Sequence, residues 1–362
     1  MNDTSTRRSA LDIVRDLPKS RLFWPVLTLA ALMVLNVIVS PGFFSIRIQD
    51  GHLFGSIIDI LRNGAPTILV ALGMTLVIAT RGIDLSVGAV VAISGALACT
   101  IIADSPDPSS PATVLSAVGV SLAFSLVLGA WNGVLVAVLG IQPIIATLIL
   151  MTAGRGIAML ITEGQIITVS SAPYKVIGAG FWFGLPVSAI IAGLMFVIAA
   201  LLTRKTALGL LIESVGINPE ASRLAGIRSR GIVSMVYIFS AVCAAIAGLM
   251  ISSNVTAADA NSAGLWIEMD AILAVVLGGT SLAGGRYSLT GTLIGAIVIQ
   301  TLTTTVYTIG IAPEITLVFK ALVVIAVCLL QSPVAQARMH RTRPTPTAPV
   351  APSTPATTGA AA

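Results

Sequence analysis

Long apolar runs, separated by short polar segments, dominate the sequence. An α-helix needs about 20 apolar residues to cross the roughly 30 Å hydrocarbon core of a bilayer. Ten runs of about this length are predicted to span, at residues 24–40, 65–80, 88–103, 113–140, 143–161, 185–202, 231–251, 267–283, 289–309 and 315–331. The fourth run is long enough to be tilted or broken. Helices satisfy their own backbone hydrogen bonds in lipid, and the alternating segments of a β-barrel are absent. The pattern therefore predicts an all-α polytopic membrane protein.

Composition supports a membrane protein. The sequence is 56% apolar and 10% charged, which is too little charge to cover the surface of a soluble fold of 362 residues. The first run, Trp24 to Val39, lacks a small-residue cleavage site and is expected to be a retained span. Cys99, Cys243 and Cys328 are isolated in apolar runs, as small buried hydrophobes are. No CxxC and no histidine cluster occurs, so no metal is expected.

The positions of the charges predict the topology. Residues 1–21 are rich in arginine and lysine, which places them in the cytoplasm. Ten spans return the chain to that side, and the tail, 333–362, begins with basic residues. From Pro344 this tail is of low complexity and expected to be disordered. Residues 22–332 are the predicted membrane domain. Because the net charge of +5 follows the topology, no nucleic-acid partner is expected.

A polar island, residues 203–230, falls on the cytoplasmic side after six spans. It contains a helix-prone stretch, LLIESV at 210–215, which Gly216 is expected to stop. Asn218 is a predicted N-cap, with Pro219 as the first helical residue, and Gly226 is a predicted C-cap glycine. The island therefore predicts two short helices joined by turns. Its charges are mixed in the middle and basic at the ends, which favours docking on a soluble partner over a position on lipid headgroups.

Glycine-rich breaks interrupt both halves of the chain, ATRGIDLSVGAV at 79–90 and VLGGTSLAGGRYS at 276–288. Paired breaks can mark inverted repeats around a transport path, or they can be ordinary tight turns. An amphipathic stretch, Phe54 to Leu61, is expected to lie in the membrane interface. The phosphate-loop pattern GxxxxGK[ST] is absent, so any ATP hydrolysis requires a partner.

Residues of the island match the sequence pattern of a known protein family. Thr206, Gly209, Gly216, Asn218 and Gly226 match a T-x-x-G, G-x-N and G-I pattern, with a departure at Ala221-Ser222, where a second alanine is usual. The chain resembles the permeases of bacterial ribose-type sugar ABC importers over about residues 24–332. Further strings support the resemblance, at 73–89, 131–137, 142–156 and 263–285. Two others, LITEGQIIT and ADANSAGLWIEMDAILAVV, resemble galactofuranose-importing members.

This resemblance implies a multi-pass permease in the bacterial inner membrane, which does no covalent chemistry and needs no cofactor. Its implied partners are a cytoplasmic ABC ATPase, a periplasmic sugar-binding protein and a second permease subunit, identical or related, within membrane lipid. The ATPase-coupling residues are then expected in the island, at Thr206, Gly209, Glu213, Gly216, Asn218, Glu220, Arg223 and Gly226.

Polar residues in otherwise apolar surroundings are candidates for the sugar pathway, because amides and carboxylates pair with hydroxyls. They are Asp84, Ser86, Asn132, Gln142, Thr147, Asp270 and Gln300. The alternative for each is hydrogen bonding between helices, and for Asp84 and Ser86 it is capping of the following span. Arg155 needs either a partner, for which Asp84, Glu163 and Asp270 are candidates, or access to the outer headgroup layer.

Two other functions make different demands on the sequence. An ion-coupled secondary transporter needs carboxylates or histidines deep within its spans, and Asp270 is the only persuasive candidate. A membrane-embedded enzyme needs a nucleophile with a base or a metal cluster, and the sequence shows neither.

Overall fold

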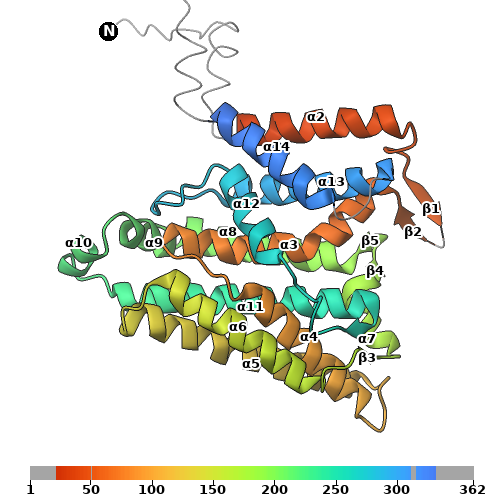
Figure 1. Cartoon of the computed structure of the whole chain (residues 1–362), viewed down its shortest axis with the longest axis horizontal. Coiled ribbons are helices and arrows are strands. Elements are labelled where there is room, and N and C mark those ends of the chain that lie inside the picture. Colours follow the sequence, from red (N-terminus) through yellow and green to blue (C-terminus); the bar gives the residue numbers. More distant parts are fainter. Residues whose placement is uncertain (1–21, 50, 311–314, 332–362) are drawn as a thin grey trace, which may run out of the picture.

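The computed structural model describes residues 22–49, 51–310 and 315–331 as a bundle of helices (Figure 1). The predicted regions 1–21 and 333–362 lie outside the described residues, with Ser332. The helices are α2 Phe23–Val39, α3 Ser56–Ala79, α4 Val87–Ala103, α5 Pro111–Gly133, α6 Pro143–Ile161, α7 Ala172–Ala179, α8 Val187–Lys205, α9 Leu208–Ile217, α10 Pro219–Leu224, α11 Ser229–Val255, α12 Ile267–Leu277, α13 Leu289–Ile309 and α14 Ile315–Gln331. A helix corresponds to each of the ten predicted spans.

Six helices of the described chain are long and apolar enough to cross a membrane. They are α3, α5 with its extension, α6, α8, α11 and α13. The prediction of a multi-pass helical protein is therefore confirmed. The predicted span 267–283 is wrong in its length, because α12 has 11 residues and rises only about 16 Å. Gly278 and Gly279 follow its last residue, and the chain turns there.

The helix bounds bear on two other local predictions. The fourth run forms one apolar helix of 28 residues, in which α5 passes at Gly133 into a π-helical turn, η2 (Val134–Val138). The amphipathic stretch Phe54–Leu61 is divided between a strand that ends at Phe54 and α3, which begins at Ser56 and continues to Ala79, and its position in the membrane interface stays a prediction. Nothing between Ser56 and Ala79 stops the helix, because the one proline, Pro66, is tolerated inside it.

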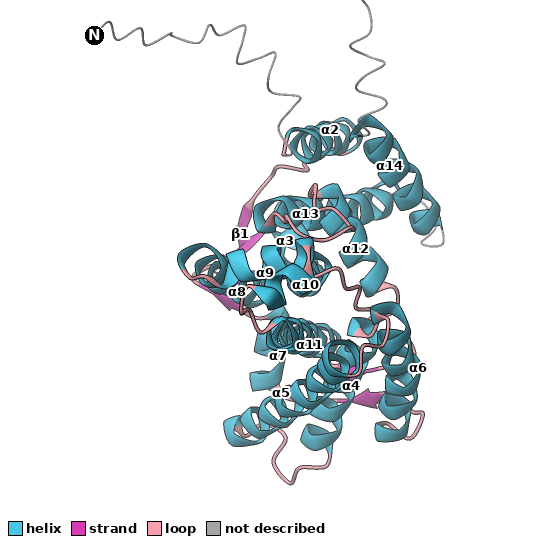
Figure 2. Cartoon of the chain, turned by 90° about the vertical axis from the view of Figure 1, so that its left-hand side faces the viewer, coloured by secondary structure: helices cyan, strands magenta, loops and turns pink. Residues whose placement is uncertain are grey.

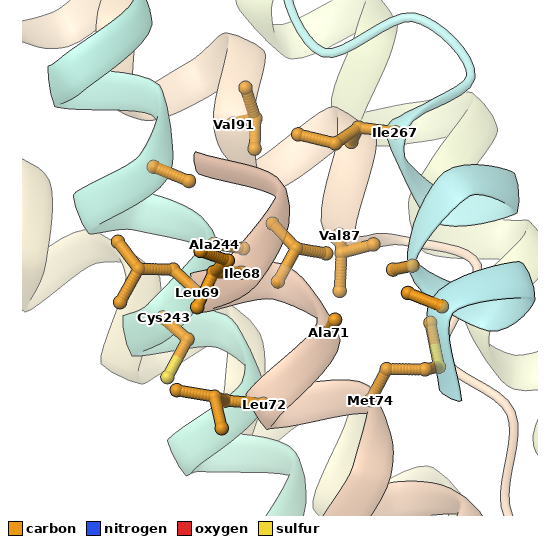
Figure 3. Packing of buried hydrophobic residues seen from close by; sticks show 14 of the residues in the cluster. Ile68, Leu69, Ala71, Leu72, Met74, Val87, Val91, Cys243, Ala244 and Ile267 are labelled. Atoms are coloured by element: carbon orange, nitrogen blue, oxygen red, sulfur yellow. The ribbon is translucent and has the colours of Figure 1, made fainter. Parts of the chain in front are cut away.

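The core lies where α3, α4, α11 and α12 pack together (Figure 3). Small residues permit this packing: a Cβ added at Gly248 of α11 would lie 2.2 Å from the carbonyl oxygen of Val91 in α4. Close backbone approach of this kind is typical of membrane helices, which gain dispersion contacts rather than a hydrophobic driving force. Cys99 and Cys243 are buried free thiols, as predicted. Cys328 has no described side chain.

Short strand pairs lie at one end of the bundle, opposite α9 and α10 (Figure 1). They are β1 Arg47–Gln49 with β2 His52–Phe54, β3 Ile167–Thr168 with β6 Ala257–Ala258, and β4 Phe181–Trp182 with β5 Leu185–Pro186, all antiparallel. The pairing of β3 with β6 joins the loop after α6 to the loop after α11. Figure 2 views the molecule from the other end, with α9 and α10 toward the reader.

Candidate functional site

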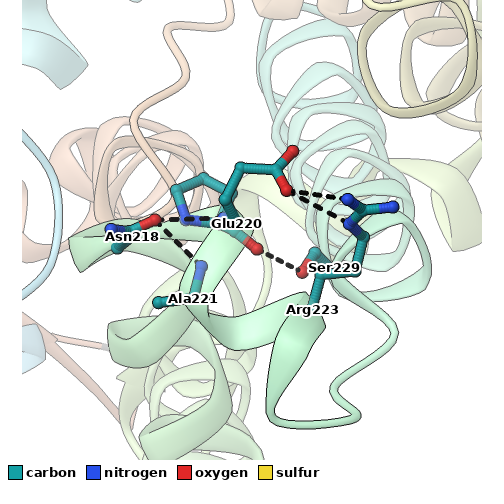
Figure 4. A network of polar contacts seen from close by, with 6 residues as sticks. Asn218, Glu220, Ala221, Arg223 and Ser229 are labelled. Atoms are coloured by element: carbon teal, nitrogen blue, oxygen red, sulfur yellow. Dashed lines mark hydrogen bonds and ion pairs between the residues drawn. The ribbon is translucent and has the colours of Figure 1, made fainter.

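The polar island folds as the two short helices that its sequence predicts. The Asn218 side chain accepts hydrogen bonds from the backbone N–H groups of Glu220 (3.1 Å) and Ala221 (3.0 Å), and so caps α10 (Figure 4). Gly226 follows α10 with a φ of 86°, and Ile227 N–H donates back to the Ser222 carbonyl at 3.0 Å. This is a glycine-terminated helix end. One detail differs: Gly216 does not stop α9, which includes it and ends at Ile217.

The island exposes apolar side chains on a charged background. Leu210, Ile217 and Leu224 are 69%, 60% and 83% exposed. Beside them Glu220 and Arg223 form a surface ion pair at 3.0 Å (Figure 4), and such a pair contributes little to stability. These exposed apolar side chains among charged residues are candidates for contact with another macromolecule.

Other predicted coupling residues shape the island or attach it to the bundle. Thr206 Oγ1 accepts the Leu208 N–H at 3.2 Å and organises the start of α9. A Cβ at Gly209 would lie 2.2 Å from the Thr203 carbonyl oxygen, so α9 lies directly against α8. Glu213 lines a small cavity with Tyr287, where burial raises the pKa of the tyrosine. The island therefore has one attached side and one free side.

Four of the predicted pathway residues come together inside the bundle. Asp84 accepts hydrogen bonds from the Ser86 hydroxyl (2.6 Å) and from the Ser240 hydroxyl of α11 (2.9 Å). Asn132 of α5 donates to Ser86 Oγ at 2.8 Å, and Thr147 of α6 donates to the Ile83 carbonyl at 3.2 Å. We call Asp84, Ser86, Asn132, Thr147 and Ser240 the polar cluster. It links α5, α6 and α11 through the turn between α3 and α4.

The capping alternative for Asp84 and Ser86 is met only in part. Ser86 occupies the N-cap position of α4, but its side chain makes no cap hydrogen bond. Asp84 instead accepts the N–H of Ser86 itself at 3.1 Å, and this shapes the turn before the helix. The cluster also contains an unused hydrogen-bond acceptor, because the buried Oδ1 of Asn132 has no partner.

A cavity of about 340 Å³ lies between this turn and the island. Thr80, Gly82 and Tyr237 line it on the side of the bundle, and Glu220 and Arg223 line it on the side of the island. The hydroxyl of Tyr237 is buried and lacks a hydrogen-bond partner. Unsatisfied buried polar groups are rare in proteins, so the Tyr237 hydroxyl and the Asn132 Oδ1 each retain capacity for a further hydrogen bond.

Three predicted pathway residues lie elsewhere. Gln142 precedes the first residue of α6 and makes no cap hydrogen bond. The side chain of Gln300 lies against Gly64 of α3. Asp270 of α12 forms an ion pair with Lys320 of α14, whose Nζ lies 2.8 Å and 3.0 Å from the two carboxylate oxygens. The sequence held a signal for this pair, because Lys320 is the only charged residue in the last apolar run.

The expected partners of Arg155 are wrong. Its guanidinium donates instead to two backbone carbonyls, of Ala260 (2.9 Å) and Ala263 (2.6 Å), in the loop that follows β6. Backbone acceptors carry no side-chain signal, so sequence inspection cannot find them. In that loop, hydrogen bonding by Ser262 holds the pKa of Asp259 below its usual range. Among the described residues, no group of three or more His, Cys, Asp or Glu side chains is placed to hold a metal ion.

Several helices that can cross a membrane, with a polar cluster buried between them, are the architecture of a membrane transport protein. The chain belongs to the family described as the branched-chain amino acid transport system / permease component, whose family model matches residues 56–328. No solved structure matches it.

Relatives within the family import sugars, according to their names. The chain is 49% identical over 320 residues to the galactofuranose transporter permease protein YtfT of Escherichia coli K12, covering 87% of this chain and 92% of the relative. It is 42% identical over 328 residues to the fructose import permease protein FruF of Bifidobacterium longum, covering 89% and 90%. The ribose import permease protein RbsC of Escherichia coli K12 is 37% identical over 312 residues, covering 84% and 92%. The predicted kinship with ribose-type sugar permeases is confirmed, and the relatives are permeases, not enzymes.

Proposed function

We propose that this chain forms the transmembrane pathway for a monosaccharide in an ATP-driven importer of the bacterial inner membrane. It crosses the membrane ten times, with both termini and the island in the cytoplasm. The observation that carries the proposal is the island itself. It presents three exposed leucine and isoleucine side chains on two short helices, α9 and α10, and buried residues of α9 attach it to the bundle. A free-standing transporter has no need of such a surface.

The partners follow from this assignment. A cytoplasmic ABC ATPase binds α9 and α10, since the chain has no phosphate loop of its own. A periplasmic binding protein delivers the sugar to the end that carries the strand pairs. A second permease, identical or related, completes the pathway. Galactofuranose is the first sugar to test, because the relative named for it shares 49% of aligned residues with this chain.

Within the chain, the polar cluster and the neighbouring cavity are the proposed inner part of the pathway. Hydroxyl-rich solutes exchange water for amide, hydroxyl and carboxylate partners, and Asn132 and Tyr237 each hold a buried atom without a partner. ATP-driven movement of the ATPase subunits then shifts the permease between outward-open and inward-open states. This requires that the ATPase subunits bind the two states of the permease with different affinity. Three further residues are proposed to line the pathway only where the second subunit closes it, and these are Gln142, Asp270 and Gln300.

The test is sugar uptake into proteoliposomes that contain the permease, its ATPase and its binding protein. Leu224→Ser is expected to lower recovery of the ATPase with the permease, and uptake, at least fivefold, with normal membrane insertion. Leu115→Ser is the matched control, because Leu115 is 73% exposed near the opposite end. Uptake that proceeds without ATP, or without any ATPase subunit, contradicts the proposal.

Glu220 offers a second test. Its carboxylate is exposed and pairs with the equally exposed Arg223, so Glu220→Ala perturbs the surface without disturbing the core. We expect ATP hydrolysis to continue while uptake falls. Asp104→Ala serves as the control, because Asp104 is an exposed acid that directly follows the last residue of α4. Equal uptake by the two variants would place the coupling surface elsewhere.

A further inference from the structure

Three segments that are far apart in the sequence meet where α9 ends. They are Ala79–Arg81 at the end of α3, Gly216–Ile217 at the end of α9, and Gly284–Gly285 in the loop between α12 and α13. The Gly285 N–H donates to the Ala79 carbonyl at 2.9 Å, and the Arg81 guanidinium donates to the Ile217 carbonyl. We call these three segments the glycine junction.

The junction leaves no space for one segment to slide on another. A Cβ at Gly216 would lie 1.8 Å from the Ala79 carbonyl oxygen and 2.6 Å from the Gly285 nitrogen. A Cβ at Gly284 would lie 2.3 Å from Cγ of Arg81. Gly284 and Gly285 have φ angles of 83° and 86°, and Arg81 has 65°. Left-handed backbone at a non-glycine residue persists only where the surroundings hold it, so the three segments are locked together.

This contact also decides the repeat hypothesis. Both glycine-rich breaks predicted from the sequence lie in the junction, so they lie at the same end of the bundle. The chain runs toward that end along α3 and α12, and away from it along α4 and α13. Repeats inverted across the membrane plane run in opposite senses, so the inverted-repeat interpretation of these two breaks is wrong.

The junction touches both the partner surface and the polar cluster. A Cβ at Gly285 would lie 3.0 Å from Cγ1 of Ile217, so the Ile217 side chain lies against the junction, and it is still 60% exposed on the island. Three residues beyond Arg81, Asp84 holds Ser240 of α11 and the turn into α4. Packed elements of this kind switch between discrete arrangements rather than deform continuously. A displacement of α9 therefore moves Ala79–Arg81, and with it the turn that carries Asp84.

We propose that the glycine junction transmits movement of the island to the polar cluster, with Arg81, Gly216 and Gly284 as positioning residues. The inference rests on the proposed function, and it adds the path by which movement of the island reaches the polar cluster. The island also contacts the bundle through the helices that continue from it, α8 and α11, and through Tyr287 before α13. The junction adds a direct contact between the island and the turn that joins α3 to α4.

The test uses Gly284→Ala in the complete transporter, because Gly284 lies outside α9 and α10 and the substitution changes none of the exposed side chains of the island. We expect the ATPase to co-purify as in the wild type and to hydrolyse ATP, while sugar imported per ATP falls at least fivefold. Uptake is measured with radiolabelled galactofuranose, ribose or fructose, whichever the wild type imports. Gly231→Ala is the control, since its Cβ would meet nothing within 4 Å at the same end of the bundle.

Arg81 gives an independent pair of variants that does not depend on how Gly284→Ala folds. Arg81→Ala removes the donor to Ile217 and is expected to uncouple, whereas Arg81→Lys keeps a donor and restores at least half of the sugar imported per ATP. A purely structural role would lower the amount of folded complex and leave that ratio unchanged, and this outcome overturns the inference. A wild type that shows no ATP-driven uptake rejects the proposed function instead.

Discussion

The ion pair between Asp270 and Lys320 allows a quantitative test of how α14 is held to the bundle. Lys320 Nζ lies 2.8 Å and 3.0 Å from the two carboxylate oxygens, and the side chains are 10% (Lys320) and 22% (Asp270) exposed. Lys320→Met keeps the length of the aliphatic stem but leaves the carboxylate without its partner. Breaking a buried pair in this way costs about 3–5 kcal/mol. Because Asp270 keeps some exposure, we expect about 3 kcal/mol, which is roughly a 100-fold change in the unfolding equilibrium.

Reversible unfolding in mixed micelles measures this cost, and a double-mutant cycle separates the pair from its surroundings. Asp270→Leu is expected to cost a similar amount, because it leaves the ammonium unpaired. The double variant, Asp270→Leu with Lys320→Met, is expected to be within about 1 kcal/mol of the wild type, as apolar replacement of a whole buried pair often is. Additive losses in the double variant would refute the reasoning. Retained sugar uptake in the double variant would also exclude Asp270 as an ion-coupling carboxylate.

Three further predictions concern single contacts. Asn218→Ala should destabilise α10 by about 1 kcal/mol, because it removes the N-cap. The loss is measured as faster amide hydrogen exchange in α10, with Asn218→Asp as the control that keeps a capping side chain. Unchanged exchange in Asn218→Ala would count against the cap. Gly248→Ala should lower the stability of the protein by about 1–3 kcal/mol through overpacking against α4. Gly193→Ala is the control and should not lower it, because the space around its Cβ is open. Equal melting temperatures of the two variants would contradict the close approach of α11 and α4. Asp84→Ala should reduce uptake at least tenfold and leave the Ser240 hydroxyl unpaired, and wild-type uptake would remove the cluster from the pathway.

Much of the fold was predictable because its signals are local. Apolar run length and turn residues placed α6, α13 and α14 at their observed bounds. Asn218 and Pro219 identified the start of α10, since a side-chain cap acts on backbone groups two or three residues away. The same local reasoning failed for α12. Its apolar run continues beyond Leu277, but the chain turns at Gly278, whose Cβ position is filled by the backbone of Gly291 and Thr292 in α13.

The sequence by itself determined a multi-pass helical protein with an island of two short helices, because hydropathy and capping depend on residues close together in the chain. Only the tertiary structure decided which polar residues meet. It gathered Asp84, Ser86 and Asn132, and it paired Asp270 with Lys320. It held Arg155 on backbone carbonyls, and it locked the island to both glycine-rich breaks. These contacts join residues from about 50 to more than 200 positions apart, or run to backbone atoms that every residue shares. Pairings of this kind depend on how the helices pack, which a single sequence does not display.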